Sequence, residues 1–270
     1  MKGQFHCMAS YLKWVPVYDL IVVPYFILQR GEINMSLTEK QSQVEYSTPR
    51  IFRWFFAACI VVGMAATVVA VLTNPPYYGS QGGVVAAITT NATSSDLMDQ
   101  THVISEVIAS YLLPLGFLAM AWLAMPGSPL LASIGAIVTL LGTLPIAVFA
   151  GEDDLYYNIA RMGSQPAVIE MAQRFNGDGV MTYYNLMFAL STVLGPVLLG
   201  IALGRARVIP RWAAAVLALS RLPVLLFTFV PYHFLIIILL VGFLLLFIGS
   251  VPVALALLKD PRKAGLQQSS

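Results

Sequence analysis

Polar residues are rare along most of this chain, and they separate six long apolar runs at residues 54–72, 103–125, 130–150, 183–203, 212–230 and 234–257. A helix needs about 20 apolar residues to cross a hydrocarbon layer of about 30 Å, and each run is close to that length. None of the runs alternates strictly between apolar and polar positions, as the strands of a membrane β-barrel do. Helices also satisfy their own backbone hydrogen bonds in lipid. The pattern therefore predicts an all-α, polytopic membrane helix bundle with six transmembrane helices.

The composition supports a membrane location. Of the 270 residues, 58% are hydrophobic and 10% are charged, which leaves too little polar surface to cover a soluble domain. We expect the lipid bilayer to be the main partner, together with a membrane-protein partner or a second copy of the chain in a homo-oligomer. We expect no nucleic acid partner.

Lysine and arginine are concentrated on one side of the six predicted spans. That side carries Lys40, Arg50, Arg53, Arg205, Arg207, Arg211, Lys259, Arg262 and Lys263. The opposite side consists of the loop 73–102, which has neither residue type, and the loop 151–182, in which Arg161 and Arg174 are outnumbered by acidic residues. Cytoplasmic loops hold the excess of basic residues, so both termini are predicted to be cytoplasmic.

The chain divides into a cytoplasmic N-terminal tail at 1–50, a transmembrane domain at 51–258 and a cytoplasmic tail at 259–270. Within the first tail, the apolar stretch 14–28 is interrupted by an aspartate and two prolines and is too short for a span. From Met35 the sequence reads as an ordinary polar tail that opens onto the first span. We expect either that translation begins at Met35 or that residues 1–34 form an interfacial segment.

The chain has no motif for nucleotide-driven or hydrolytic chemistry. It lacks a Walker A loop, a GxGxxG turn, an HExxH helix and a GxSxG elbow. Its two cysteines, Cys7 and Cys59, are far apart and form no CxxC pair. We therefore expect no cofactor, and the motifs assign no metal.

Ionisable residues inside the predicted spans are the strongest indication of a functional site. A charged side chain near the centre of the bilayer costs about 2.5 to 3.5 kcal/mol on insertion scales. Glu106 lies about one turn inside the outer end of the second span, and Arg221 lies near the middle of the fifth. His102 precedes Glu106 by four residues, which places both on one helix face, and Asp99 joins that face if the helix begins early. Asn185 enters from the outer end of the fourth span.

Three interpretations of these polar residues remain open. In the first, Glu106 and Arg221 pair within the bundle or hydrogen-bond to neighbouring helices, while His102 lies at the interface. In the second, they line a path for a substrate or a proton, together with Asn185 and Tyr184. In the third, His102 and Glu106 bind a metal ion with an acidic residue of the next outer loop. The acidic residues there are Glu152, Asp153 and Asp154.

Proline and glycine predict where the helices bend and pack. A proline inside a span frees a backbone carbonyl, so Pro145 and Pro223 are expected at kinks. Gly200 and Gly204, four residues apart, predict a close helix contact. In the second outer loop, apolar residues on one face of 166–177 predict a short amphipathic helix. The residues of that face are Val168, Met171, Ala172 and Phe175.

Two segments, GEDDLYYNIARMGSQPAVIEMAQRF and YYNLMFALSTVLGPVLLGIALGRARVIPRWAAAVLAL, follow one another along the chain. This arrangement resembles a family of bacterial six-helix membrane proteins of unknown function, in which an outer loop leads into a span that ends in a basic turn followed by VPRWAA or a similar sequence. Here VIPRWAAAV occupies that turn, and the resemblance covers roughly residues 50–258. The resemblance implies a multi-pass protein of the bacterial plasma membrane, and it carries no catalytic or binding residue.

Three classes of function fit these observations. The first is a structural or accessory membrane protein that binds a partner or lipid, which is slightly favoured because the spans contain few clear charges. The alternative is a permease-like carrier of a small molecule or ion through the bundle interior. The third is a membrane enzyme with a site at the outer face. The candidate polar site consists of His102, Glu106, Asn185 and Arg221.

Overall fold

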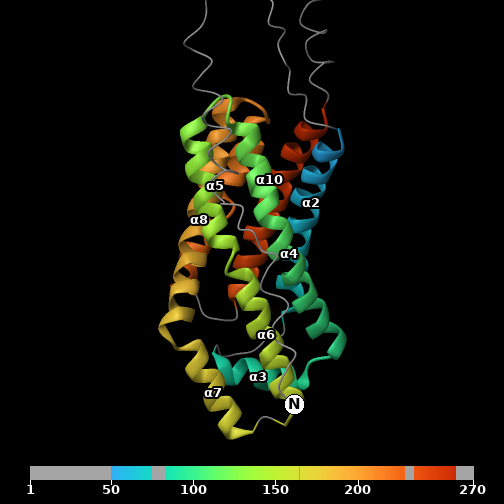
Figure 1. Ribbon diagram of the computed structural model, residues 1–270, viewed down its shortest axis with the longest axis vertical. Coiled ribbons are helices and arrows are strands. Elements are labelled where there is room, and N and C mark those ends of the chain that lie inside the picture. The colour runs from blue at the N-terminus through green and yellow to red at the C-terminus, as the bar shows by residue number, and fades with distance from the viewer. Residues whose placement is uncertain (1–49, 75–82, 164, 229–233, 260–270) are drawn as a thin grey trace, which may run out of the picture. The chain divides into compact units, whose positions relative to one another are not determined.

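The structure is a computed structural model that describes residues 50–74, 83–163, 165–228 and 234–259. These residues belong to one compact unit of the chain, Thr48–Ser270. Their regular elements are helices, and the described residues contain no strand (Figure 1). The predicted all-α class is confirmed for this part of the chain. Residues 1–49 and 260–270, with the predicted start at Met35, lie outside the described residues.

Five helical stretches are long and apolar enough to cross a membrane. They are α2, α4, α5 together with α6, α8 and α10, and they correspond to every predicted span except the fifth. The bounds of the described helices are α2 Arg50–Thr73, α3 Val84–Thr93, α4 Asp96–Ala124, α5 Pro129–Thr143, α6 Ile146–Arg161, α7 Pro166–Asn176, α8 Gly179–Ala206, α9 Arg211–Leu219, η3 Leu222–Thr228 and α10 Leu235–Leu258.

The fifth predicted run, 212–230, is not one continuous helix. Its first half forms α9 and its second half forms the 3₁₀ helix η3, with Ser220 and Arg221 between them. Pro223 explains the break, because it has no backbone N–H and its ring would clash with the carbonyl oxygen of Leu219 in an α-helix. The residue before a proline also avoids the α conformation. Among the described residues, five of the six predicted spans are therefore present as membrane-length helices.

Small residues let the long helices approach closely. α2 packs against α4 and α10, and α5 packs against α8. On α8, Gly200 and Gly204 face α9, and a Cβ atom on Gly200 would lie 2.8 Å from the carbonyl oxygen of Ala214. The close contact predicted for these two glycines is confirmed. Pro145 separates α5 from α6, as expected for a kink.

A smaller apolar cluster joins α3, α7 and the second half of α6. The predicted amphipathic helix is confirmed as α7. Its packed residues are Val168, Ile169 and Ala172, whereas Met171 and Phe175 of the predicted face are exposed. The face of α7 that packs on α3 and α6 therefore includes Ile169 in place of the predicted Met171 and Phe175.

α6 continues for about three turns beyond the predicted end of the third span at Ala150. This extension contains the acidic residues Glu152, Asp153 and Asp154, which were expected in a loop. A short polar helix is stable mainly through packing against its neighbours, and here α3 and α4 both contact α6. Asp153 consequently lies on a helix that packs beside α4.

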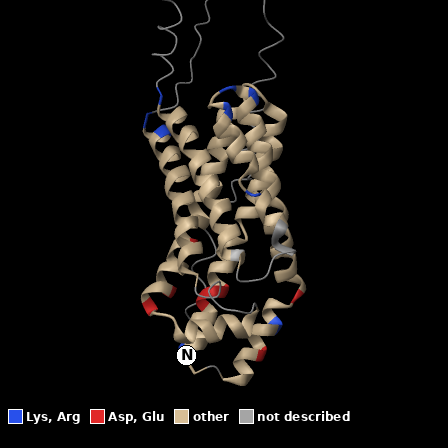
Figure 2. Ribbon diagram, turned by 180° about the vertical axis from the view of Figure 1, so that it is seen from behind, with Lys and Arg blue, Asp and Glu red and all other residues tan. Residues whose placement is uncertain are grey.

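Charged residues separate to the two ends of the long helices (Figure 2). Most lysines and arginines lie where α2 begins, α8 meets α9 and α10 ends, whereas the acidic residues gather near α3, α6 and α7. The guanidinium Nη1 of Arg53 donates to the carbonyl oxygen of Lys259 at 3.1 Å, which holds the start of α2 beside the end of α10. We refer to these as the basic end and the acidic end.

Candidate functional site

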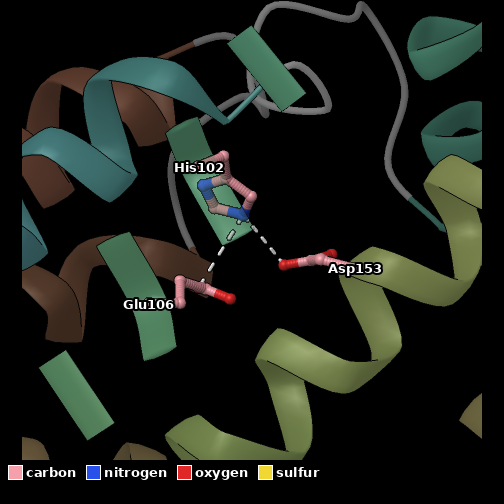
Figure 3. Close-up of side chains that lie close together, drawn as sticks. All are labelled: His102, Glu106 and Asp153. Carbon is pink, nitrogen blue, oxygen red and sulfur yellow. Dashed lines mark hydrogen bonds and ion pairs between the residues drawn. The ribbon is translucent and has the colours of Figure 1, made fainter. Parts of the chain in front are cut away.

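Side chains from two helices meet near the acidic end. α4 carries His102 and Glu106 one turn apart, and α6 brings Asp153 across from them (Figure 3). The Nε2 atom of His102 lies 3.0 Å from Oδ2 of Asp153 and 3.8 Å from Oε1 of Glu106. His102 is only 3% exposed. The structure thus brings together two of the predicted site residues and one of the three acidic residues considered as their partners.

The end of α2 supplies two further contacts to His102. The Nδ1 atom donates to the carbonyl oxygen of Ala70 at 2.8 Å, because a carbonyl oxygen can only accept. Ala70 lies in the last turn of α2, where carbonyl groups accept no backbone N–H bond from the same helix. The amide of Asn74 lies 3.2 Å from Nε2. The imidazole is held at both nitrogens, with Nε2 directed at the two carboxylates.

Ion pairs outside this cluster hold α6 against α4. Arg161, at the end of α6, lies 2.5 Å from Asp96 and 3.2 Å from Asp99, both in the first turn of α4. Asp99 is buried and also accepts a hydrogen bond from the hydroxyl of Ser94 at 2.6 Å. The partial positive charge at a helix N-terminus favours carboxylates there. α4 begins early enough to include Asp99, and these contacts fix α6 beside the start of α4.

The two acidic residues next to Asp153 have different surroundings. Glu152 accepts hydrogen bonds from the hydroxyl of Tyr156 and, at 2.6 Å, from the amide of Asn176. The bond from Asn176 joins α6 to the end of α7. Asp154 is exposed. Of the three acidic residues considered from the sequence, Asp153 is therefore the one that faces His102.

A cavity of about 60 Å³ opens beside His102 and Glu106. Thr67 of α2 and Asn74, which follows α2, also line it, and the remaining lining is apolar or aromatic. A cavity volume of roughly 15 Å³ holds one water molecule, so the cavity has room for a few water-sized groups. We refer to it as the outer cavity. It can take an ion with some hydration, or a very small polar solute.

A second cavity of about 20 Å³, the inner cavity, adjoins the outer one. Its polar lining consists of Thr139, Thr143, Ser191, Thr192 and Arg221. Ile146, Phe188 and Phe243 line both cavities and therefore stand between them. Arg221 is 1% exposed, and its guanidinium carbon lies 3.8 Å from the centre of the Phe243 ring. A fixed positive charge is thus buried at the point where the helix of the fifth run breaks.

The four predicted site residues have different surroundings. His102 and Glu106 share the outer cavity, and Arg221 lines the inner one. Glu106 and Arg221 form no ion pair with each other in the described part of the chain. Asn185 is exposed on α8 and lines neither cavity. Asn74 was not predicted, because it follows the first span and no periodic pattern includes it.

The arrangement offers chemistry for charged ligands. The imidazole of His102, the carboxylate of Glu106 and the amide of Asn74 line the outer cavity, and the carboxylate of Asp153 contacts the same imidazole. This group of side chains suits a proton or a cation. The guanidinium at the inner cavity suits an anionic or hydrogen-bond-accepting group. Comparisons of the chain with protein families, with curated proteins and with solved structures found no match.

Proposed function

We propose that this chain is a permease-like membrane protein that takes a small polar solute or an ion into its helix bundle from the acidic end. The pair of adjoining cavities carries the proposal, because together they lead from His102 and Glu106 to Arg221. Phe188 and Phe243 stand where the two cavities meet. Apolar constrictions of this kind can gate a polar path in membrane proteins.

The cost of burying charge supports a functional role. Each ionisable group inside a membrane helix costs several kcal/mol unless the protein compensates it. Stability alone gives little reason to keep such groups, since well-packed apolar residues often replace buried ion pairs without loss. In addition, transporters commonly bind their substrates at helices that are interrupted within the membrane, and Arg221 lies at such an interruption between α9 and η3.

In the proposed topology, α9 and η3 together form one further crossing, the fifth along the chain, which brings the total to six. α9 has 9 residues and η3 has 7, which gives a combined length of about 28 Å at about 1.5 and 2.0 Å per residue. This length is close to the hydrocarbon thickness of about 30 Å. An even number of crossings places both ends of the described unit on the same side of the membrane.

The charge distribution supports an orientation for this topology. The basic end is assigned to the cytoplasm, because cytoplasmic loops carry the excess of lysine and arginine. His102 and the outer cavity then open toward the outside. We further propose the bacterial plasma membrane as the location, on the basis of the resemblance of residues 50–258 to a bacterial six-helix family.

Thiol accessibility tests whether the inner cavity connects to water. Thr143 lines this cavity and is buried. In a background with Cys59→Ala and Cys7→Ser, the Thr143→Cys variant is treated with a small, membrane-impermeant methanethiosulfonate reagent from the outside. A carrier opens its path transiently, so we expect the introduced thiol to be modified in intact cells. The labelled fraction is measured by mass spectrometry.

Ala132→Cys is the matched control. Ala132 lies on the same helix, α5, is 0% exposed and belongs to the apolar core. Its thiol should stay unmodified in the folded protein. Equal and negligible labelling of both thiols would contradict a carrier and favour the structural or accessory role. Labelling of Thr143→Cys from the cytoplasmic side alone would contradict the proposed entry at the acidic end.

A further inference from the structure

The contacts of His102 place three hydrogen-bond acceptors close together. Because Nδ1 donates its hydrogen to Ala70, a neutral imidazole presents a lone pair at Nε2. The carboxylate oxygens that face this nitrogen, at 3.0 Å on Asp153 and 3.8 Å on Glu106, are acceptors as well. Groups of this kind repel one another in a buried site unless a positive charge lies between them. The geometry therefore requires a positive charge among the three side chains, which either a proton on Nε2 or a bound cation supplies.

Two buried oxygen atoms beside the cluster provide an independent observation. Oε2 of Glu106 and Oδ1 of Asn74 have no hydrogen-bond partner among the described residues. Asn74 is 6% exposed, lines the outer cavity, and has its amide 3.2 Å from Nε2 of His102. A buried oxygen without a partner costs about 1 to 3 kcal/mol. Such oxygens are typical of sites where a ligand uses them.

We propose that His102, Glu106 and Asp153 bind a divalent first-row transition-metal ion, with the amide oxygen of Asn74 as a fourth ligand. Nitrogen and oxygen ligands at about 2.0 to 2.2 Å from such an ion lie about 3.0 to 3.6 Å from one another. The two distances from Nε2 to the carboxylates, 3.0 and 3.8 Å, are close to this spacing. The ligand atoms of all three residues lie within 4.8 Å of one another.

The surroundings of the three ligands fit this assignment. Histidines that bind metals usually donate their other ring N–H to a carbonyl or carboxylate, as His102 does to Ala70. Rotating the Asn74 amide by half a turn exchanges its oxygen and nitrogen, which are nearly identical in shape. This rotation directs Oδ1 at the site. Arg161 holds α6 in place through Asp96 and Asp99.

The ligand chemistry selects the class of ion. One imidazole nitrogen with carboxylate and amide oxygens suits Mn²⁺, Fe²⁺, Co²⁺ or Zn²⁺, whereas Mg²⁺ and Ca²⁺ prefer oxygen ligands alone. The two carboxylates also balance the charge of a divalent ion, so the occupied site is neutral, as a buried site requires. This inference rests on the proposed function in that it names the ion of the outer cavity. Binding of the metal is measured by titration and access to Thr143 by thiol labelling, so the failure of one proposal can be told from the failure of the other.

Cobalt titration tests the site directly. Full-length protein in lipid nanodiscs is freed of metal with a chelator and titrated with Co²⁺, and the visible ligand-field absorption is recorded. We expect one saturable site per chain, with bands that Zn²⁺ removes and equal Mg²⁺ does not. Asp153→Asn should weaken Co²⁺ binding by about 100-fold or more, because changes to outer partners alone cost about 10- to 100-fold.

Two further variants control for charge and for folding. Asp154→Asn makes the same chemical change one residue away, on an exposed side chain, and should leave Co²⁺ affinity unchanged. Asn74→Asp replaces a neutral oxygen ligand with a charged one and should tighten Co²⁺ binding. If the thermal midpoint shows that Asp153→Asn does not fold, the tighter Co²⁺ binding of Asn74→Asp tests the metal site in its place. A hydrogen-bonding role for Asn74 alone predicts no gain.

Two outcomes would overturn the metal site: no saturable Co²⁺ absorption in the unmodified protein, or equal affinity in Asp153→Asn and Asp154→Asn. In either case His102 and Asp153 form only a hydrogen-bonded pair. Metal binding together with an unreactive Thr143→Cys would support the site and contradict the carrier. A reactive Thr143→Cys without metal binding would keep the carrier and overturn the site.

Discussion

The outer and inner cavities both hold buried ionisable side chains, but they hold them in different ways. At the outer cavity, His102 is surrounded by side chains and a carbonyl from three helices. At the inner cavity, Arg221 lies at a break in the backbone and stacks on the ring of Phe243. The outer site is thus assembled by helix packing, and the inner site depends on an interruption of one helix.

This difference indicates what each site can do. Several donor atoms from separate helices define a directional site, whose affinity depends on keeping the helices in register. The guanidinium of Arg221 offers a positive charge and directional hydrogen-bond donors, and the ring of Phe243 stabilises that charge. The outer cavity is therefore suited to a cation, whereas the buried guanidinium at the inner cavity repels cations and suits an anionic or hydrogen-bond-accepting group. Three predictions test this comparison.

The largest expected loss of stability comes from breaking the ion pairs that hold α6 against α4. Arg161→Met removes the cation beside Asp99, whose side chain is 2% exposed. Breaking a buried ion pair from one side costs about 3 to 5 kcal/mol, and because Arg161 is partly exposed the expected loss is about 3 kcal/mol. The free energy of unfolding in mixed micelles measures it. Co²⁺ affinity should fall as well, because Asp153 moves away from His102.

Arg174→Met is the control for this prediction. Arg174 lies 3.9 Å from Glu170 on the exposed surface of α7, and exposed pairs contribute about 0 to 1 kcal/mol. Its replacement should change neither unfolding nor Co²⁺ affinity. If Arg161→Met behaves like Arg174→Met, the ion pairs do not organise the outer site, and the contrast with the inner cavity is lost.

The second prediction concerns the stacking of Arg221 on Phe243. A desolvated guanidinium over an aromatic face is stabilised by about 1 to 2 kcal/mol. A double-mutant cycle with Arg221→Met and Phe243→Leu should give a coupling energy of that size in the unfolding free energy. Co²⁺ affinity at the outer cavity should stay unchanged in both single variants. This result would separate the two cavities energetically.

Phe188 supplies the control for the cycle. It lines the same two cavities as Phe243, but its ring contact is with Phe149, at a centroid distance of 5.3 Å. The cycle of Phe188→Leu with Arg221→Met should therefore show a coupling near zero. Equal coupling in both cycles would mean that Arg221 responds to general packing and that the stacking on Phe243 has no specific role.

Helical periodicity explains which parts of the outer site could be predicted. His102 and Glu106 were placed on one face because residues four apart on a helix are neighbours, whatever the rest of the fold does. Asp153 could be narrowed only to one of three acidic residues, because its helix depends on packing against α3 and α4. Asn74 follows the end of α2, where no repeating pattern remains. The contacts between helices therefore could not be predicted from the sequence.

The fifth run shows the complementary limit. Its apolar composition indicates a lipid environment, but composition does not say whether the backbone stays α-helical. Pro223 predicted a kink, which is the usual effect of proline in a helix, and the structure has a complete change to η3 instead. Arg221 was identified by its charge alone. Asn185 was included because of its depth along α8, although its face of that helix is exposed.

The smallest expected effect is at the start of α4, where two neighbouring serines have different roles. Ser95 caps the helix by accepting a long 3.3 Å bond from the backbone N–H of Met98, whereas Ser94 donates to buried Asp99 at 2.6 Å. Ser95→Ala should cost only about 0.5 kcal/mol, the low end for a helix cap, because Arg161 already orders this turn. Ser94→Ala should cost more, since a bond to a charged group is lost. Equal losses in unfolding free energy would show that the hydrogen bond from Ser94 to Asp99 contributes no more than the helix cap.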